Sequence, residues 1–170
     1  MTEPDFQAAY HGHKHVLYRF AFRMTGSAAV AEDIAQDCFL ALWRNPRAYD
    51  AGRGALRPFL LGMARKLALK RWRAERPHDP LEDDSAICGP LDLVGEERAA
   101  TVARALGMLP PLQREAVVLA EYEDLSLEEI SSATECELAA VKSRLHRGRQ
   151  NLRRLLAPLL ETKGTTYGTK

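Results

Sequence analysis

Apolar residues recur along most of the chain at the three- and four-residue spacing of an amphipathic helix. The clearest stripe consists of Ala31, Ile34, Ala35, Cys38 and Leu42. These positions share one face of a helix, so the stripe predicts a side that is turned toward a core. No stretch alternates apolar and polar residues for long, and runs of β-branched residues are absent. The pattern therefore predicts an all-α fold.

Capping residues and prolines mark the ends of the first three predicted helices. The first helix runs from about 5 to 24 and stops at Gly26, which suits a left-handed C-cap. Ser27 caps the second helix, which ends before Pro46. The third helix spans about 56–76, and its apolar positions predict a buried face made of Phe59, Leu60, Met63, Ala64 and Leu67.

Four further helices are predicted in the second half of the chain. The first two cover about 96–109 and 112–122, with two prolines as a hard break between them. Ser126 and Glu129 form a capping box that opens a short third helix. The fourth runs from about 138 to 156 and completes a second helical unit.

A change in composition separates the two helical units. Residues 77–95 hold three prolines, two glycines and an excess of acidic side chains, so they predict a flexible acidic linker. We predict a first domain over 1–76, this linker, a second domain over 96–160 and a disordered tail over 161–170. With such a linker, both domains are expected to keep their surfaces free.

The net charge of +1 hides a strong local polarity. Residues 44–76 carry ten basic and two acidic side chains, a balance of +8, and residues 138–160 carry six basic and no acidic ones. Between them, residues 77–101 carry one basic and seven acidic side chains, and residues 121–137 carry seven acidic and no basic ones. Basic blocks of this size attract phosphates, although a solvated helix face is the simpler alternative.

Several classes of protein are disfavoured by the sequence. No apolar run reaches the roughly 18 residues that a membrane helix needs, and Cys38, Cys88 and Cys136 fit neither a disulfide framework nor a zinc site. No Gly-rich phosphate loop or nucleophile–base set indicates an enzyme. His11 and His15 share a helix face, but we expect neither a metal nor a cofactor there. The sequence predicts a reduced, cytoplasmic protein without membrane insertion.

The last two predicted helices have the character of a DNA-binding helix-turn-helix. Val141, Leu145 and Leu152 would hold the second of these helices against the domain. Its polar and basic residues would then reach phosphates or base edges in the major groove. They are Lys142, Ser143, Arg144, Arg147 and Arg149.

Motifs in both halves are similar to those of the extracytoplasmic-function (ECF) sigma factors. In the second half, Leu109–Glu115 (LPPLQRE), Leu125–Ile130 (LSLEEI) and Val141–Arg147 (VKSRLHR) resemble region 4. In the first half, Ala31–Phe39 (AEDIAQDCF) with Leu42–Arg44 resembles region 2.2, and Met63–Leu69 resembles regions 2.3 to 2.4. The motifs stand in the family's order and spacing over roughly residues 10–157.

The resemblance implies a non-enzymatic subunit of RNA polymerase that recognises promoters. Its partners would be core polymerase, through the β′ clamp helices and the β flap, promoter DNA and an anti-sigma factor. The exposed patch of the second helix would bind the clamp helices; its residues are Asp33, Gln36, Asp37 and Leu40. The basic third helix would open and read the −10 element; its cations are Arg57, Arg65, Lys66, Lys70, Arg71 and Arg73. The helix-turn-helix residues named above would read the −35 element.

The chain departs from the family pattern at several of these positions. Lys66 stands where Asn is common, and Lys70 stands where Asp is common, so the identity of the base read there is open. Glu135 takes a turn position that is commonly Gly, and Ala139–Ala140 replaces Gly-Thr. A non-glycine residue in a left-handed conformation costs on the order of 1 kcal/mol. Trp72 is either a stacking platform for bases or a core residue.

Two other functions remain open from the sequence alone. A stand-alone helix-turn-helix regulator would explain the second domain only, and a sigma mimic would titrate an anti-sigma factor without directing transcription. Because the linker leaves both DNA-binding faces free, we expect control by an anti-sigma partner that covers the Asp33–Leu40 patch and the recognition helix together. Cys88 in the linker is a weak candidate for redox sensing.

Overall fold

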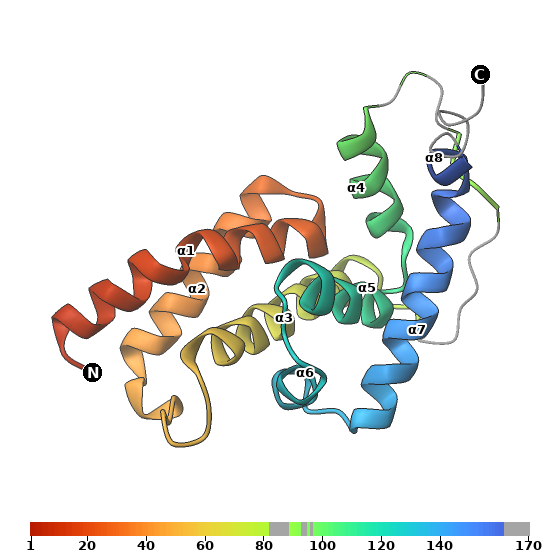
Figure 1. Cartoon of the computed structure of the whole chain (residues 1–170). Helices are drawn as coiled ribbons and strands as arrows, with labels where there is room; N and C mark the ends of the chain where they lie inside the picture. Colours follow the sequence, from red (N-terminus) through yellow and green to blue (C-terminus); the bar gives the residue numbers. More distant parts are fainter. Residues whose placement is uncertain (82–88, 93–94, 96, 162–170) are drawn as a thin grey trace, which may run out of the picture.

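The computed structural model describes residues 1–81, 89–92, 95 and 97–161, and these form helices and connections without a β-strand (Figure 1). The first half contains α1 (Glu3–Thr25), α2 (Ala28–Arg44), a 3₁₀ turn (Pro46–Ala48) and α3 (Leu56–Glu75). The second half contains α4 (Arg98–Met108), α5 (Pro111–Val117), a π turn (Val118–Tyr122), α6 (Leu127–Thr134), α7 (Leu138–Leu155) and α8 (Ala157–Glu161). The predicted all-α fold is confirmed.

Local capping chemistry sets the helix ends much as the sequence predicts. Gly26 closes α1 with φ 70°, and the Ser27 hydroxyl accepts a hydrogen bond from the Val30 amide at the start of α2. The capping box of Ser126 and Glu129 opens α6. A second capping box, between Thr2 and Asp5, starts α1 slightly earlier than its apolar pattern suggests.

The helix predicted over 112–122 is an α-helix followed by a wider π turn. Pro111 takes the first helical position of α5, where its missing amide hydrogen is no loss. From Val118 the helix widens, and the Glu123 amide bonds the Val118 carbonyl. The widened turn brings Glu123 to a buried position, with 1% of its surface exposed.

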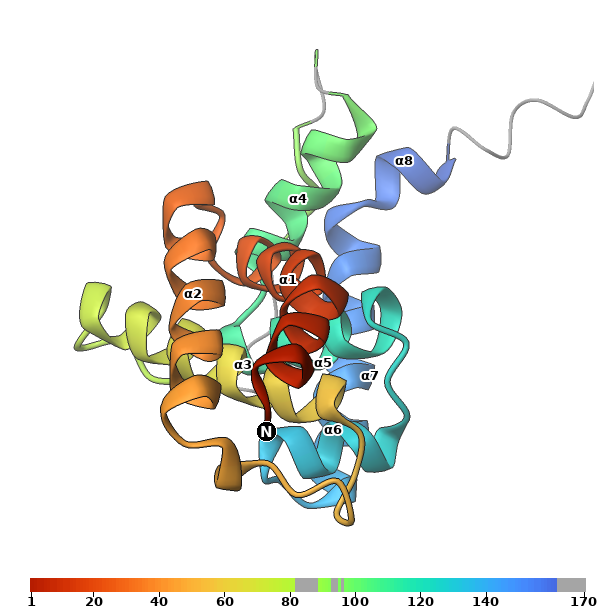
Figure 2. The same cartoon turned by 90° about the vertical axis from the view of Figure 1, so that its left-hand side faces the viewer.

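Helix α3 is covered from two sides, and this changes its predicted buried face. Leu60 and Ala64 are buried as expected, and Phe59, Met63 and Leu67 are half-buried and pack against the core. Leu61 and Gly62 are buried in addition. The reason is that α3 packs on α1 and α2 of its own domain and also on α6, so it forms part of the first domain's side of the contact between the domains (Figures 1 and 2).

Part of the predicted linker and most of the predicted tail lie outside the described residues. This holds for residues 82–88, 93–94, 96 and 162–170, and therefore for the proposed redox role of Cys88. Among the helices that the structure describes, none is long and apolar enough to cross a membrane.

Candidate nucleic-acid interface

The predicted docking patch on α2 is exposed. Asp33, Gln36, Asp37 and Leu40 all face solvent, on the side of α2 opposite its buried stripe. Leu40 is a large apolar side chain with 46% of its surface exposed. Asp33 lies 3.8 Å from the Arg71 guanidinium of α3, so the patch adjoins the basic helix. The sequence prediction that these four residues form one exposed face agrees with the geometry.

The basic residues of α3 divide into two groups. Lys70 and Arg73 are exposed near the end of the helix, and Arg71 is half-buried beside α2. The other three cations, Arg57, Arg65 and Lys66, contact carboxylates of the second domain. The expectation that the DNA-binding faces of both domains are free is therefore wrong for this part of α3.

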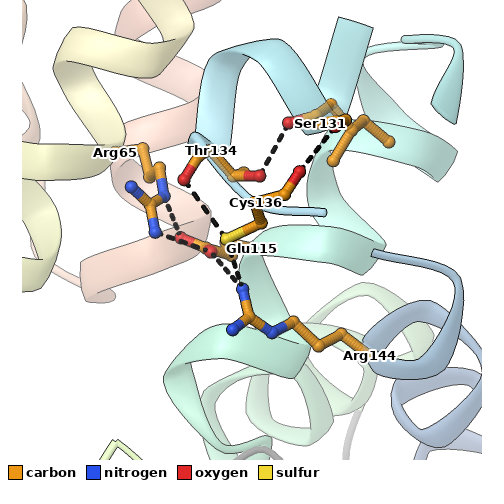
Figure 3. A network of polar contacts seen from close by, with 7 residues as sticks. Arg65, Glu115, Ser131, Thr134, Cys136 and Arg144 are labelled. Carbon is orange, nitrogen blue, oxygen red and sulfur yellow. Dashed lines mark hydrogen bonds and ion pairs between the residues drawn. The ribbon is translucent and has the colours of Figure 1, made fainter. Parts of the chain in front are cut away.

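Arg65 makes the most buried of these contacts, with Glu115 of α5. Its Nε lies 2.6 Å from Glu115 Oε2 and its Nη2 lies 3.1 Å from Oε1. Arg144 of α7 reaches the same carboxylate from its other side, at 3.9 Å (Figure 3). Burial raises the pKa of Glu115, although both arginines favour its charged form. Glu115 thus joins a cation of the first domain to a cation of the recognition helix.

Arg57 meets the buried Glu123 at the end of the π turn. Its Nη1 donates to the Glu123 carbonyl at 2.7 Å and its Nη2 donates to Oε2 at 2.8 Å. Arg23 of α1 lies 3.8 Å from Glu123 Oε1 and stacks over the Tyr122 ring, 4.1 Å from its centre. Two arginines of the first domain therefore converge on one segment of the second domain.

Lys66 and Glu135 are both departures from the sigma-factor pattern, and they form an ion pair. Lys66 Nζ donates to Glu135 Oε1 at 2.6 Å, and this hydrogen bond lowers the pKa of the Glu135 carboxyl. Glu135 closes α6 in the left-handed region, at φ 55° and ψ 37°. The turn thus keeps the conformation that favours glycine and holds a non-glycine residue in it.

Arg114 ties α5 to the end of α1. It is buried, and its guanidinium donates to the Met24 carbonyl at 2.6 Å and to the Gly107 and Leu109 carbonyls at 2.6 and 2.9 Å. These carbonyls end helices or follow them, where a cation is favoured. Burial lowers the pKa of Arg114 to about 10, so it stays protonated at neutral pH.

The recognition helix α7 is seated on its domain as predicted. Val141 and Leu145 are buried and Leu152 is half-buried. The side chains expected to face DNA are not equivalent. Lys142 and Arg149 are exposed, whereas Ser143, Arg144 and Arg147 are half-buried.

Two of the recognition-helix arginines are engaged within their own domain. Arg149 pairs with Glu121, with 2.7 Å between Nε and Oε1. Arg144 turns back toward the domain, where its Nη1 donates to Cys136 Sγ at 3.0 Å (Figure 3). At the start of α7, Glu137 makes no side-chain capping bond, in line with the absence of the family's Gly-Thr from the first turn.

The acidic residues that cover α3 were not predicted from the sequence. Glu115 lies in the motif that resembles region 4, and Glu123 and Glu135 lie in the acidic block 121–137. The signal that could have found them is the complementarity of this block, at −7, with the basic block 44–76, at +8.

A groove of about 860 Å³ opens between α1, the end of α3 and α4. Apolar side chains such as Tyr18, Phe22 and Val102 line it together with Arg19 and Arg76. Trp72 also lines the groove, and its indole N–H is buried without a hydrogen-bond partner. Trp72 is thus neither a fully exposed surface on which bases could stack nor a core residue with all of its hydrogen bonds made.

Comparison with known proteins identifies the family. Models described as Sigma-70 region 2 and as Sigma-70, region 4 match residues 9–78 and 99–152. The ECF RNA polymerase sigma factor SigE of Mycolicibacterium smegmatis is 34% identical over 164 residues, which are 91% of this chain and 62% of SigE. SigK of Mycobacterium sp. (strain KMS) is 30% identical over 159 residues, 89% of this chain and 82% of SigK. The chain belongs to the sigma-70 family, in its ECF group.

A solved structure has the same architecture. The sigma factor RpoE from Bartonella quintana, determined in complex with the anti-sigma factor NepR, superimposes with a TM-score of 0.72 at 25% sequence identity. The match covers 90% of this chain and 97% of RpoE. The similarity therefore extends over both domains.

Proposed function

We propose that this protein is an RNA polymerase sigma factor, which binds the core enzyme and directs it to promoters by recognition and not by catalysis. The observation that carries the proposal is the presence of both sigma-70 regions, in order, on one chain. A stand-alone regulator would need only the helix-turn-helix, and the region 2 motifs would then have no use. Core polymerase and promoter DNA are the partners that follow.

The α2 patch is the proposed docking site for the β′ clamp helices. Asp33 and Asp37 supply negative charge, and Leu40 supplies an exposed apolar contact on the same face. All four residues of the patch are exposed, so a partner helix can reach them together. The second domain would contact the β flap.

The α3 cations are the proposed site for the −10 element. Opened single-stranded DNA needs cations along its backbone and surfaces between them for bases. The six basic side chains follow one helix, and Trp72 lies among them. They are Arg57, Arg65, Lys66, Lys70, Arg71 and Arg73.

The proposed −35 contacts are those of α7, with separate roles. Lys142 and Arg149 are exposed and suited to phosphates, whereas Ser143 and Arg147 lie closer to the domain. Arg144 touches Cys136 and Glu115 in this conformation, so its first role is to hold α7 against α5. Base reading by Arg144 would require its side chain to turn outward.

An anti-sigma factor is the proposed regulatory partner. It would cover the Asp33–Leu40 patch and the recognition helix together, and the groove beside Trp72 is a further proposed contact. RpoE of Bartonella quintana, which shares the fold, was solved with such a partner. The groove combines apolar side chains with arginines, so it suits a helix that carries both apolar and acidic residues.

Selection of promoters from a random DNA library tests the proposal. Core polymerase with this protein is expected to enrich two sequence elements at a fixed spacing, and neither core polymerase nor the protein alone should enrich them. Enrichment of a single element or an inverted repeat by the free protein would support a stand-alone regulator instead. Binding to core polymerase without any enriched promoter would indicate a sigma mimic.

A further inference from the structure

We propose that the protein has a small-molecule site, a basic pocket at α3, α5 and α7 that binds a nucleoside polyphosphate, which is a nucleotide with a chain of two or more phosphates. The inference goes beyond the proposed function, because it assigns a ligand in addition to promoter DNA. Only its consequence for the −10 element, given below, rests on the proposed function.

The basic pocket has a volume of about 640 Å³ and is lined by residues of both domains. Small-molecule sites are commonly clefts of about 300–1,000 Å³, so a nucleotide fits its size. Among the described residues, no carboxylate lines the pocket. Its cations are Arg65, Lys66, Lys70 and Arg73 of α3 and Arg144 of α7.

Three of these cations follow one face of α3. Lys66, Lys70 and Arg73 are spaced by four and three residues, so they lie one above another along about 10 Å of the helix. Lys70 and Arg73 are exposed, and within the described part of the chain neither forms an ion pair with a carboxylate. A row of cations suits a chain of phosphates, because each phosphate can meet a different side chain.

The carboxylates near the pocket do not neutralise it. Arg65 and Arg144 share the single carboxylate of Glu115, at 2.6 and 3.9 Å, and Lys66 pairs with Glu135. Five cations are thus set against two carboxylates. Salt screens a partly enclosed excess of charge less than an exposed one, so the pocket attracts anions.

Leucine side chains supply the apolar part of the wall. They are Leu69 of α3, Leu81 beyond the end of α3 and Leu112 of α5. Leu112 is half-buried and does not belong to the hydrophobic core, so its surface is available to a ligand. The phosphates of a nucleotide match the cations and its base matches the leucines, whereas an inorganic anion would leave the leucines uncovered.

A bound nucleotide would compete with promoter DNA. Lys66, Lys70 and Arg73 line the pocket and also belong to the proposed −10 site. Phosphates of the nucleotide and of the DNA backbone cannot occupy the same cations at once. The nucleotide would therefore weaken binding of the −10 element.

Isothermal titration calorimetry of the whole chain tests the pocket, at fixed ionic strength and without divalent cations. The probes are ATP and GTP, with AMP and inorganic tripolyphosphate as controls for the phosphate chain and the base. We expect ATP or GTP to bind once per chain and at least about tenfold more tightly than AMP, which lacks the chain of phosphates. Binding should also be at least about fivefold tighter than that of tripolyphosphate, which lacks the base.

Arg73→Ala tests the cations, with Arg44→Ala as its matched control. Both are exposed arginines in the last turn of a first-domain helix, but only Arg73 lines the pocket. The affinity for ATP should fall at least about tenfold further for Arg73→Ala than for Arg44→Ala.

Leu112→Glu tests the wall that the second domain contributes, with Leu112→Gln as its matched control. The two new side chains have the same shape and differ by one negative charge, and Leu112 belongs to none of the proposed DNA-binding sets. Leu112→Glu should weaken ATP binding at least about fivefold more than Leu112→Gln, because its carboxylate would face the phosphates. Circular dichroism shows whether each variant is folded, and the arginine pair decides the question if Leu112→Glu is not.

The inference is overturned if neither ATP nor GTP binds with a Kd below about 1 mM, if tripolyphosphate binds as tightly as ATP, or if a folded variant matches its control. It is also overturned if a single-stranded oligodeoxynucleotide binds more tightly than ATP with the same dependence on Leu112→Glu, since the pocket would then take DNA. Failure of the sigma-factor proposal is separate: core polymerase would then select no promoter, whether or not the chain binds ATP.

Discussion

The seating of the recognition helix predicts that Gly148→Ala destabilises the second domain. Gly148 lies in the middle of α7, where a Cβ would be 2.6 Å from Val117 Cγ2 and 3.1 Å from the Gln113 carbonyl oxygen. Val117 is buried, and a β-branched side chain in a helix has one strongly preferred rotamer, so it has little room to move. Overpacking of this kind costs about 1–3 kcal/mol.

The higher helix propensity of alanine stabilises the variant and so opposes the overpacking, and a control variant removes that effect. Replacing Gly by Ala inside a helix gains about 1 kcal/mol, so the net loss for Gly148→Ala is roughly 0–2 kcal/mol. Gly107→Ala, in α4 of the same domain, gains up to the same amount and meets nothing within 4 Å. The difference in unfolding free energy between the two variants should therefore be about 1–3 kcal/mol.

Thermal unfolding followed by circular dichroism measures this difference. For a chain of this size, 1 kcal/mol corresponds to about 2–4 °C, so Gly148→Ala should melt several degrees below Gly107→Ala. Equal melting temperatures, or a more stable Gly148→Ala, would refute the close packing of α7 on α5. The assignment of which α7 side chains face the −35 DNA would then be wrong.

Three further predictions concern the other surfaces. Reversing Asp33 and Asp37 to Lys should abolish binding to core polymerase with helical content unchanged, because both side chains are exposed; full-strength co-purification with core would refute the docking patch. Lys142→Ala should weaken binding to all −35 duplexes alike and lower the slope of log affinity against log salt by about one. Arg144→Ala should lower the melting temperature of the protein. If Arg144→Ala is as stable as the unaltered protein but loses sequence preference at one −35 position, Arg144 reads bases. Burial raises the pKa of Cys38 to about 12, so the native protein should resist alkylation at Cys38 near pH 8, and rapid modification seen by mass spectrometry would contradict the packing of α2.

Short-range signals in the sequence predicted the elements well because their physics is local. Gly26 and Ser27 each act on a few neighbouring amides, so the end of α1 and the start of α2 follow from the residues themselves. The same holds for the capping box at Ser126. At Glu135 the sequence left either a strained left-handed turn or a slightly different geometry, and the structure has the left-handed turn.

The relation between the domains could not be predicted in this way. Periodicity shows that a helix has an apolar face, but it does not show that Gly62 of α3 meets Ala133 of the second domain. The basic block 44–76 was interpreted as a surface for phosphates and the acidic block 121–137 as a surface facing solvent, so the ion pairs between them were not predicted. Arg65 and Glu115 lie fifty residues apart, and only the fold brings them together.

Run-off transcription from a selected promoter tests the central claim most directly. Core polymerase, the promoter and this protein are combined, with the Asp33→Lys, Asp37→Lys double variant as the matched control. A defined transcript is expected only with core polymerase and the unaltered protein, and it should be lost with the double variant. A transcript of equal strength without the protein, or no transcript although the protein binds both core polymerase and promoter, would contradict its assignment as a sigma factor.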